Sequence, residues 1–188
     1  MKITNLVIGK STPDFVKSGV DVYVKRISRY TRFEHMELPG LKKSTNLSLK
    51  TYKEKEGELL QKHITAQDYL VLLDAGGKRM DSPGFSKFIQ QCALENRKNV
   101  VFLTGGAYGF SPAIYARSNF KLSLSSMTFS HQVIRLAFLE QLYRAFTILN
   151  NEPLSPLIYS STNVLYQFNF KMGMKNQLTF LLSEAKSA

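Results

Sequence analysis

The 188-residue sequence has a single cysteine, Cys92, and no tryptophan. One cysteine excludes an internal disulfide and a cysteine-rich zinc site, so we expect Cys92 to be a small buried hydrophobic side chain. No apolar run approaches the roughly 20 residues that span a bilayer, and residues 1–10 lack the apolar stretch and cleavage site of a signal peptide. We therefore expect a cytoplasmic protein that does not enter a membrane.

Acidic side chains are scarce as well. The sequence has 14 Asp and Glu residues against 25 Lys and Arg residues, which gives a formal charge of +11. Residues 1–64 have 13 positive and 7 negative side chains, whereas residues 151–188 have 3 and 2, so the excess belongs to the first 150 residues. A basic protein favours an anionic partner, most often nucleic acid, because contacts with phosphates release condensed counterions.

Short β-branched runs alternate with segments of helical period, and an apolar fraction of 44% is enough for a packed core. The expected strands are 3–8, 33–38, 69–74, 99–104 and 121–125, and helices are expected to begin near residues 13, 47, 81, 111 and 131. About five such alternations predict an α/β fold with a mainly parallel sheet. The Lys- and Glu-rich helix 47–63 is expected to present its charges to solvent.

Three loops lie where parallel strands would end, at residues 73–77, 105–109 and 124–130. Ligands of open parallel sheets collect at this edge, and the glycines would let a ligand approach the backbone closely. The composition suits an adenine-bearing ligand held by main-chain hydrogen bonds. Neither a G-x-G-x-x-G fingerprint nor a phosphate-binding loop motif is present, which argues against a nicotinamide dehydrogenase and a P-loop NTPase.

The last expected helix, residues 131–150, is apolar almost all round, which predicts burial by its own domain or by a partner subunit. Glu140 and Arg144 are spaced to form an ion pair. Arg135 has no such local partner, so its head group is expected either to reach solvent or to meet an anion. His131 either acts as a general base or hydrogen-bonds the start of the helix.

Taken together, the segments 72–74, 102–109, 124–135 and 140–145 resemble the RlmH family. These are small bacterial SPOUT-class enzymes that methylate N3 of a pseudouridine in 23S ribosomal RNA. The similarity runs from Met1 to about Pro153. It implies an α/β fold with a C-terminal trefoil knot, a homodimer, S-adenosylmethionine as the methyl donor, and 23S rRNA within the 50S subunit or 70S ribosome as the partner.

The methyl transfer that the resemblance implies needs a base to remove the weakly acidic N3 proton, and our hypothesis is that His131 is this base. A nearby cation would favour the N3 anion, and our hypothesis is that Arg135 orients the substrate or stabilises that anion; no metal is implied. RNA would lie against the basic first helix and the Lys42-Lys43 loop. The implied cofactor-binding residues are Leu73, Asp74, Gly105, Gly106, Ser125, Ser126, Met127, Thr128, Phe129 and Ser130.

The C-terminal segment departs from the family pattern. Family members usually end in a short tail with a Tyr-His pair that helps to form the substrate site, whereas this chain continues from Asn150 to Ala188 without a histidine. We therefore expect a methyltransferase domain at residues 1–153 and an atypical extension at 154–188. Two alternatives stay open: a non-catalytic RNA-binding or ribosome-assembly protein on the same fold, and a SPOUT methyltransferase that acts on another RNA.

Overall fold

The computed structural model describes residues 1–11, 13–41, 48–106 and 108–152. The Lys42-Lys43 loop and the extension 154–188 lie outside the described residues. The strands are β1 (Lys2–Ile8), β2 (Arg32–Leu38), β3 (Tyr69–Arg79), β4 (Asn99–Thr104) and β5 (Phe120–Ser123). The helices are α1 (Asp14–Ile27), α2 (Leu49–Gln61), α3 (Ser82–Leu94), α4 (Pro112–Arg117) and α5 (Val133–Leu149). None of these helices is both long and apolar enough to cross a membrane.

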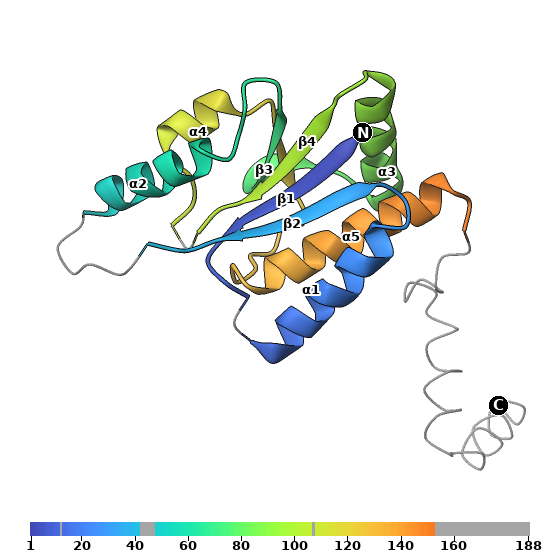
Figure 1. Ribbon diagram of the computed structural model, residues 1–188, viewed down its shortest axis with the longest axis horizontal. Coiled ribbons are helices and arrows are strands. Elements are labelled where there is room, and N and C mark those ends of the chain that lie inside the picture. Colours follow the sequence, from blue (N-terminus) through green and yellow to red (C-terminus); the bar gives the residue numbers. More distant parts are fainter. Residues whose placement is uncertain (12, 42–47, 107, 153–188) are drawn as a thin grey trace, which may run out of the picture. The chain divides into compact units, whose positions relative to one another are not determined.

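The strands form one five-stranded sheet in the order β2-β1-β4-β3-β5, and every pair of neighbours is parallel. Helices α1, α3 and α5 cover one face of this sheet, and α2 and α4 cover the other (Figure 1). The prediction of an α/β fold with a parallel sheet is confirmed, whereas the trefoil knot stays a prediction. Because both faces are covered, the central strands β1 and β4 are buried along almost their whole length.

Three of the helices, α2, α3 and α4, begin at polar side chains that cap their first backbone amides. The hydroxyl oxygen of Ser48 accepts from Thr51 N, the carboxylate of Asp81 accepts from Gly84 N, and the Ser111 hydroxyl oxygen accepts from Ile114 N. Pro83 lies at the second position of α3 and Pro112 at the first position of α4. Their missing N–H groups cost no hydrogen bond there, because the first amides of a helix have no partner within the helix. These caps set where α2, α3 and α4 start.

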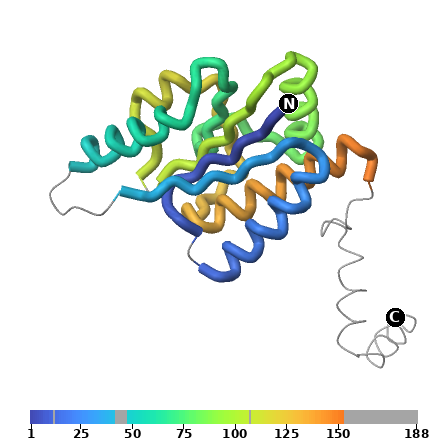
Figure 2. The backbone as a smooth tube through the Cα atoms, viewed as in Figure 1, coloured from blue at the N-terminus to red at the C-terminus, as the bar shows by residue number. Residues whose placement is uncertain are grey.

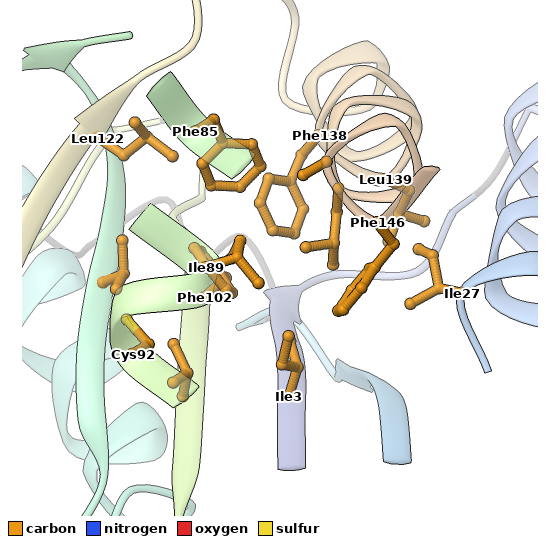
Figure 3. Close-up of a cluster of buried hydrophobic side chains, with 14 of the residues drawn as sticks. Ile3, Ile27, Phe85, Ile89, Cys92, Phe102, Leu122, Phe138, Leu139 and Phe146 are labelled. Carbon is orange, nitrogen blue, oxygen red and sulfur yellow. The ribbon is translucent and has the colours of Figure 1, made fainter. Parts of the chain in front are cut away.

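The larger core lies between the sheet and helices α1, α3 and α5, and it is dominated by phenylalanine. Phe85, Phe102 and Phe138 face one another in Figure 3, and the ring centroids of Phe102 and Phe138 are 4.8 Å apart. Both of these side chains are fully buried. Cys92 belongs to the same cluster and is 3% exposed, as its sequence context predicts, and burial raises the pKa of its thiol to about 11.

Strand β3 extends further than the sequence indicates. The apolar run predicts an end at Asp74, but after an interruption the pairing of β3 with β5 resumes at Lys78 and Arg79. Gly77 allows this return, because a Cβ there would fall 2.6 Å from a backbone atom of Lys121. The intervening residues bulge out of the ladder and put Asp74 at the edge of the sheet where β4 and β5 also end.

Candidate active site

A pocket of about 480 Å³ lies at the carboxyl ends of β3, β4 and β5, a size typical of small-molecule sites. Its wall combines apolar side chains with loop backbone. The lining residues are Leu73, Asp74, Ala75, Thr104, Gly105, Gly106, Gly109, Phe110, Leu122, Ser123, Leu124, Ser125, Met127, Thr128, Phe129, Ser130, His131 and Ile134. The three loops selected from composition therefore meet around one cavity.

The structure brings nearly all of the sequence-predicted site residues to this wall. His131 and every expected cofactor-binding residue except Ser126 line the pocket, and Arg135 does not. Sequence reasoning missed Thr104, Phe110, Leu122, Ser123 and Ile134. Thr104 is the last residue of β4, so the rule that ligands meet strand ends could have found it, whereas Phe110 and Ile134 depend on how the chain packs.

The loop after β5 is shaped by its own short side chains. Met127 N donates to the Ser125 hydroxyl oxygen over 2.9 Å, and the Ser123 hydroxyl donates to the Ser125 carbonyl oxygen over 3.0 Å. Such local bonds hold a turn without regular secondary structure. The loop leaves Met127 75% exposed and Phe129 43% exposed beside the pocket, so it offers an apolar surface to a ligand or a partner.

Asp74 supplies a carboxylate at the pocket wall. One of its oxygens accepts from Gly76 N over 2.8 Å, and the other accepts from the Tyr115 hydroxyl over 2.5 Å. Burial and then this hydrogen bond raise the pKa of Tyr115 to about 12, so the phenol stays a donor at neutral pH. Both oxygens of Asp74 are thus held in place by the protein itself.

Thr104 contributes a polar atom with nothing to bind within the described structure. The residue is 3% exposed, and its buried Oγ1 has no hydrogen-bond partner among the described residues. A buried hydroxyl without a partner is costly, and at a pocket wall it is suited to a polar group of a ligand.

His131 lies at the pocket in the turn that leads into α5. Gln132 Nε2 donates to the Lys10 carbonyl oxygen over 3.0 Å, which attaches this turn to the segment after β1. Figure 2 shows the start of α5 beside that segment. The His131 side chain is exposed, so it can exchange protons with solvent and with a bound substrate.

Both expectations for Arg135, that its head group reaches solvent or meets an anion, are wrong. The side chain is fully buried, and Nη1 donates to the Gly9 carbonyl oxygen over 2.9 Å and to the Ser11 hydroxyl over 3.3 Å, while Nη2 donates to the Ile8 carbonyl oxygen. Its Nε has no acceptor among the described residues. Burial lowers the pKa of Arg135, and the Glu37 carboxylate opposes that effect. Main-chain carbonyls can satisfy a guanidinium as an anion would, which the sequence alone does not reveal.

The ion pair predicted between Glu140 and Arg144 is present. Arg144 Nη2 lies 2.6 Å from Glu140 Oε1, and both side chains are half-buried on α5.

In the charged helix α2, Glu54, Lys55 and Glu58 are exposed as expected, but Glu56 is buried and 3% exposed. No cluster of His, Cys, Asp and Glu in the described part of the chain has the composition to hold a metal ion.

A family model described as "Predicted SPOUT methyltransferase" matches residues 1–154, the part of the chain that contains this pocket. The chain belongs to the SPOUT methyltransferase family. Two curated relatives, each named "Ribosomal RNA large subunit methyltransferase H", are 48% identical over 153 residues and come from Parabacteroides distasonis and Flavobacterium johnsoniae. The match covers 81% of this chain and 98% of each relative.

This SPOUT chain is accordingly a methyltransferase, and its similarity to the RlmH family is confirmed. A probable methylase family protein from Haemophilus influenzae Rd KW20 aligns with 98% of this chain and 88% of its own at 12% identity and a TM-score of 0.45. Residues beyond 154 lie outside the family match.

Proposed function

We propose that this SPOUT enzyme methylates N3 of a pseudouridine in 23S ribosomal RNA, with S-adenosylmethionine as the methyl donor, in the cytoplasm. The observation that carries the proposal is the pocket at the ends of β3, β4 and β5 in a chain 48% identical to relatives named for ribosomal RNA large subunit methylation. Family membership favours this enzyme over a non-catalytic RNA-binding protein on the same fold.

The pocket fits a nucleoside-based methyl donor in three respects. Its size suits a ligand of this class, the loops after β4 and β5 expose backbone groups for adenine, and Thr104 and Asp74 add a hydroxyl and a carboxylate for polar groups. Leu73, Gly105, Gly106 and the loop 125–130 would hold the ligand. S-adenosylmethionine supplies a methyl group on a sulfonium, which an in-line nucleophile can displace.

In the proposed reaction the N3–methyl bond forms as the methyl–sulfur bond breaks, and the N3 proton leaves to a base. His131 is the proposed base, because it lies at the pocket, is exposed and carries an imidazole that can accept a proton. Arg135 is proposed to act as an orienting residue through the loop it holds, since its contacts are with Ile8, Gly9 and Ser11 rather than with the pocket.

The RNA is proposed to lie against helix α1 and the Lys42-Lys43 loop. Lys17, Lys25 and Arg29 are exposed on or beside α1, which supports this placement of the excess positive charge. Neutralised phosphates release counterions, so binding should weaken steeply as salt rises.

A second groove supports the proposed homodimer. It has a volume of about 430 Å³ and shares Leu124 and Phe129 with the first pocket. Its six other lining residues all come from α1 and α5: Tyr23, Val133, Leu136, Ala137, Glu140 and Gln141. A second copy seated here would border the proposed cofactor site.

We further propose that residues 1–153 form the catalytic domain and that residues 154–188 form an extension.

The test is transfer of labelled methyl groups from S-adenosylmethionine to 50S subunits or 70S ribosomes that lack the modification, followed by mapping of the methylated nucleotide. The proposal expects one labelled pseudouridine in 23S rRNA and a loss of turnover of about 10²-fold or more with His131→Ala. Label in tRNA instead would identify another RNA substrate, and absence of transfer to any RNA would refute the enzymatic proposal.

A further inference from the structure

Helix α2 contains a buried carboxylate that the proposed mechanism does not use. Glu56 is 3% exposed, and its Oε2 is buried without a hydrogen-bond partner among the described residues. Its neighbours Glu54, Lys55 and Glu58 on the same helix are all exposed. An unpartnered buried carboxylate oxygen destabilises a fold, so stability does not explain the presence of this side chain.

The Glu56 carboxylate lies against the glycine loop of the pocket. A Cβ on Gly106 would fall 2.7 Å from Glu56 Oε2 and 2.9 Å from Oε1, so only glycine lets the two groups approach this closely. Gly106 lines the cofactor pocket, whereas Glu56 does not. The loop backbone is therefore positioned between the carboxylate and the cavity.

Two further contacts keep α2 at this loop. A Cβ on Gly57 would fall 2.3 Å from the Ser111 hydroxyl oxygen, so α2 is packed tightly on the start of α4. The rings of Tyr52 and Tyr108 meet edge-on with centroids 5.3 Å apart, which joins α2 to the glycine loop itself. Helix α2, which carries Glu56, cannot move away from the loop without breaking these contacts.

We propose that Glu56 is a positioning residue for the methyl-donor site: when the donor occupies the pocket, the free carboxylate oxygen accepts a main-chain N–H of the glycine loop at Gly106 and fixes that loop. This inference rests on the proposed function of the pocket. It assigns to Glu56 an acceptor role, which the ionised carboxylate fills more strongly than a protonated carboxyl or an amide oxygen would.

The surroundings of Glu56 make that role pH-dependent. Burial raises the pKa of Glu56, and the Tyr52 hydroxyl opposes the shift. Among the described residues, Tyr52 on the same helix is the titratable group that acts on the carboxylate, and the Tyr108 ring of the loop packs on Tyr52. Formation of a hydrogen bond to the ionised form lowers the pKa again, so donor binding in mildly acidic solution releases a proton.

The experiment is calorimetric titration of the full chain with S-adenosylmethionine at several pH values between about 4.5 and about 7, each in two buffers of different ionisation enthalpy, which counts the released protons. Glu56→Gln keeps the shape and removes the charge, Glu56→Asp keeps the charge, and Glu58→Gln is the exposed control on the same helix. Hydrogen exchange of peptides that contain Gly106, with and without the donor, reports on the loop directly.

We expect Glu56→Gln to weaken binding roughly tenfold or more, to abolish the proton release and to remove donor-induced protection at Gly106. Glu56→Asp should bind less tightly but still release a proton, and Glu58→Gln should match the wild type. If the wild type binds and Glu56→Gln shows the same affinity and proton release, the inference is refuted and the proposed function stands. If the folded wild type binds no donor, both fail.

Discussion

The hydrophobic cores on the two faces of the sheet differ in composition. The face covered by α1, α3 and α5 has an aromatic core that includes Phe85, Phe102 and Phe138, whereas the core under α2 and α4 is mainly aliphatic with Phe110 as its buried phenylalanine. Among the described residues, each face also has one buried charged side chain at the pocket end of the sheet: Arg135 on the first face and Glu56 on the second.

These two buried groups differ in how they are satisfied. Both terminal nitrogens of Arg135 donate to oxygens of the β1–α1 segment, so the guanidinium joins α5 to that segment. Glu56 faces the glycine loop with one oxygen unpartnered in the described structure. Arg135 therefore stabilises the fold, whereas Glu56 has a carboxylate oxygen that is free to accept a hydrogen bond next to the site.

The largest effect should come from the aromatic core. Phe138→Ala removes a fully buried ring from contact with Phe102 and should lower the free energy of unfolding by about 3–5 kcal/mol. Leu60→Ala, at a buried position of the opposite face, should cost about 2–3 kcal/mol. Urea denaturation measures both, and a larger loss for Leu60→Ala would reverse the comparison of the two faces.

Arg135→Met should follow, with a loss of about 2–3 kcal/mol in the free energy of unfolding, because it leaves the buried carbonyl of Ile8 and the half-buried carbonyl of Gly9 without their donor. Arg144→Met is the matched control on the same helix. Its half-buried pair with Glu140 should contribute no more than about 1 kcal/mol. Equal losses in chemical denaturation would contradict the assignment of Arg135 as the group that joins α5 to the β1–α1 segment.

Near neutral pH, Glu56→Gln should raise the free energy of unfolding, whereas the substitutions above lower it. The pKa of Glu56 is raised in the folded protein. The protonated side chain therefore contributes stability that is fully present below the ordinary carboxyl pKa of 4.5 and is lost as pH rises through the folded pKa. The glutamine variant lacks this slope, so it should gain stability relative to the wild type as pH rises. Thermal melts between about pH 4 and about pH 7 measure the difference. Parallel curves would show that Glu56 is not destabilised by burial.

Thr104→Val should have the smallest effect on folding. It replaces an unpartnered buried hydroxyl with a methyl group of similar size, so stability should change by less than about 1 kcal/mol. Donor affinity should nevertheless fall about fivefold, because the pocket loses a polar group that can hydrogen-bond the ligand. Paired denaturation and binding titrations separate these effects; an unchanged affinity would remove Thr104 from the proposed site.

The strand and helix pattern and the position of the pocket could be predicted from the sequence. Buried parallel strands leave continuous apolar runs, and their loops must meet at one edge, so pocket residues such as Gly106 and Met127 can be selected from the sequence alone. The resumption of β3 at Lys78 could not be predicted, because it depends on the approach of Gly77 to the β5 backbone.

The partners of the buried charges could not be predicted either. Arg135 binds carbonyls more than 120 residues away in sequence, and carbonyls carry no residue-type signal. Glu56 lies in a run of charges that is typical of a solvated helix face, and only the packing of α2 on Gly106 distinguishes it from Glu54 and Glu58. Local pattern indicates which helix forms, whereas tertiary contacts decide which of its charges are buried.

The most direct test of the central claim is a crystal structure of the full chain determined with S-adenosylmethionine present. We predict electron density for the adenosyl group between Gly105 and Gly106 on one side and the loop 125–130 on the other, with the methyl group accessible from His131. Density for the donor at a different surface, with this pocket empty, would contradict the account.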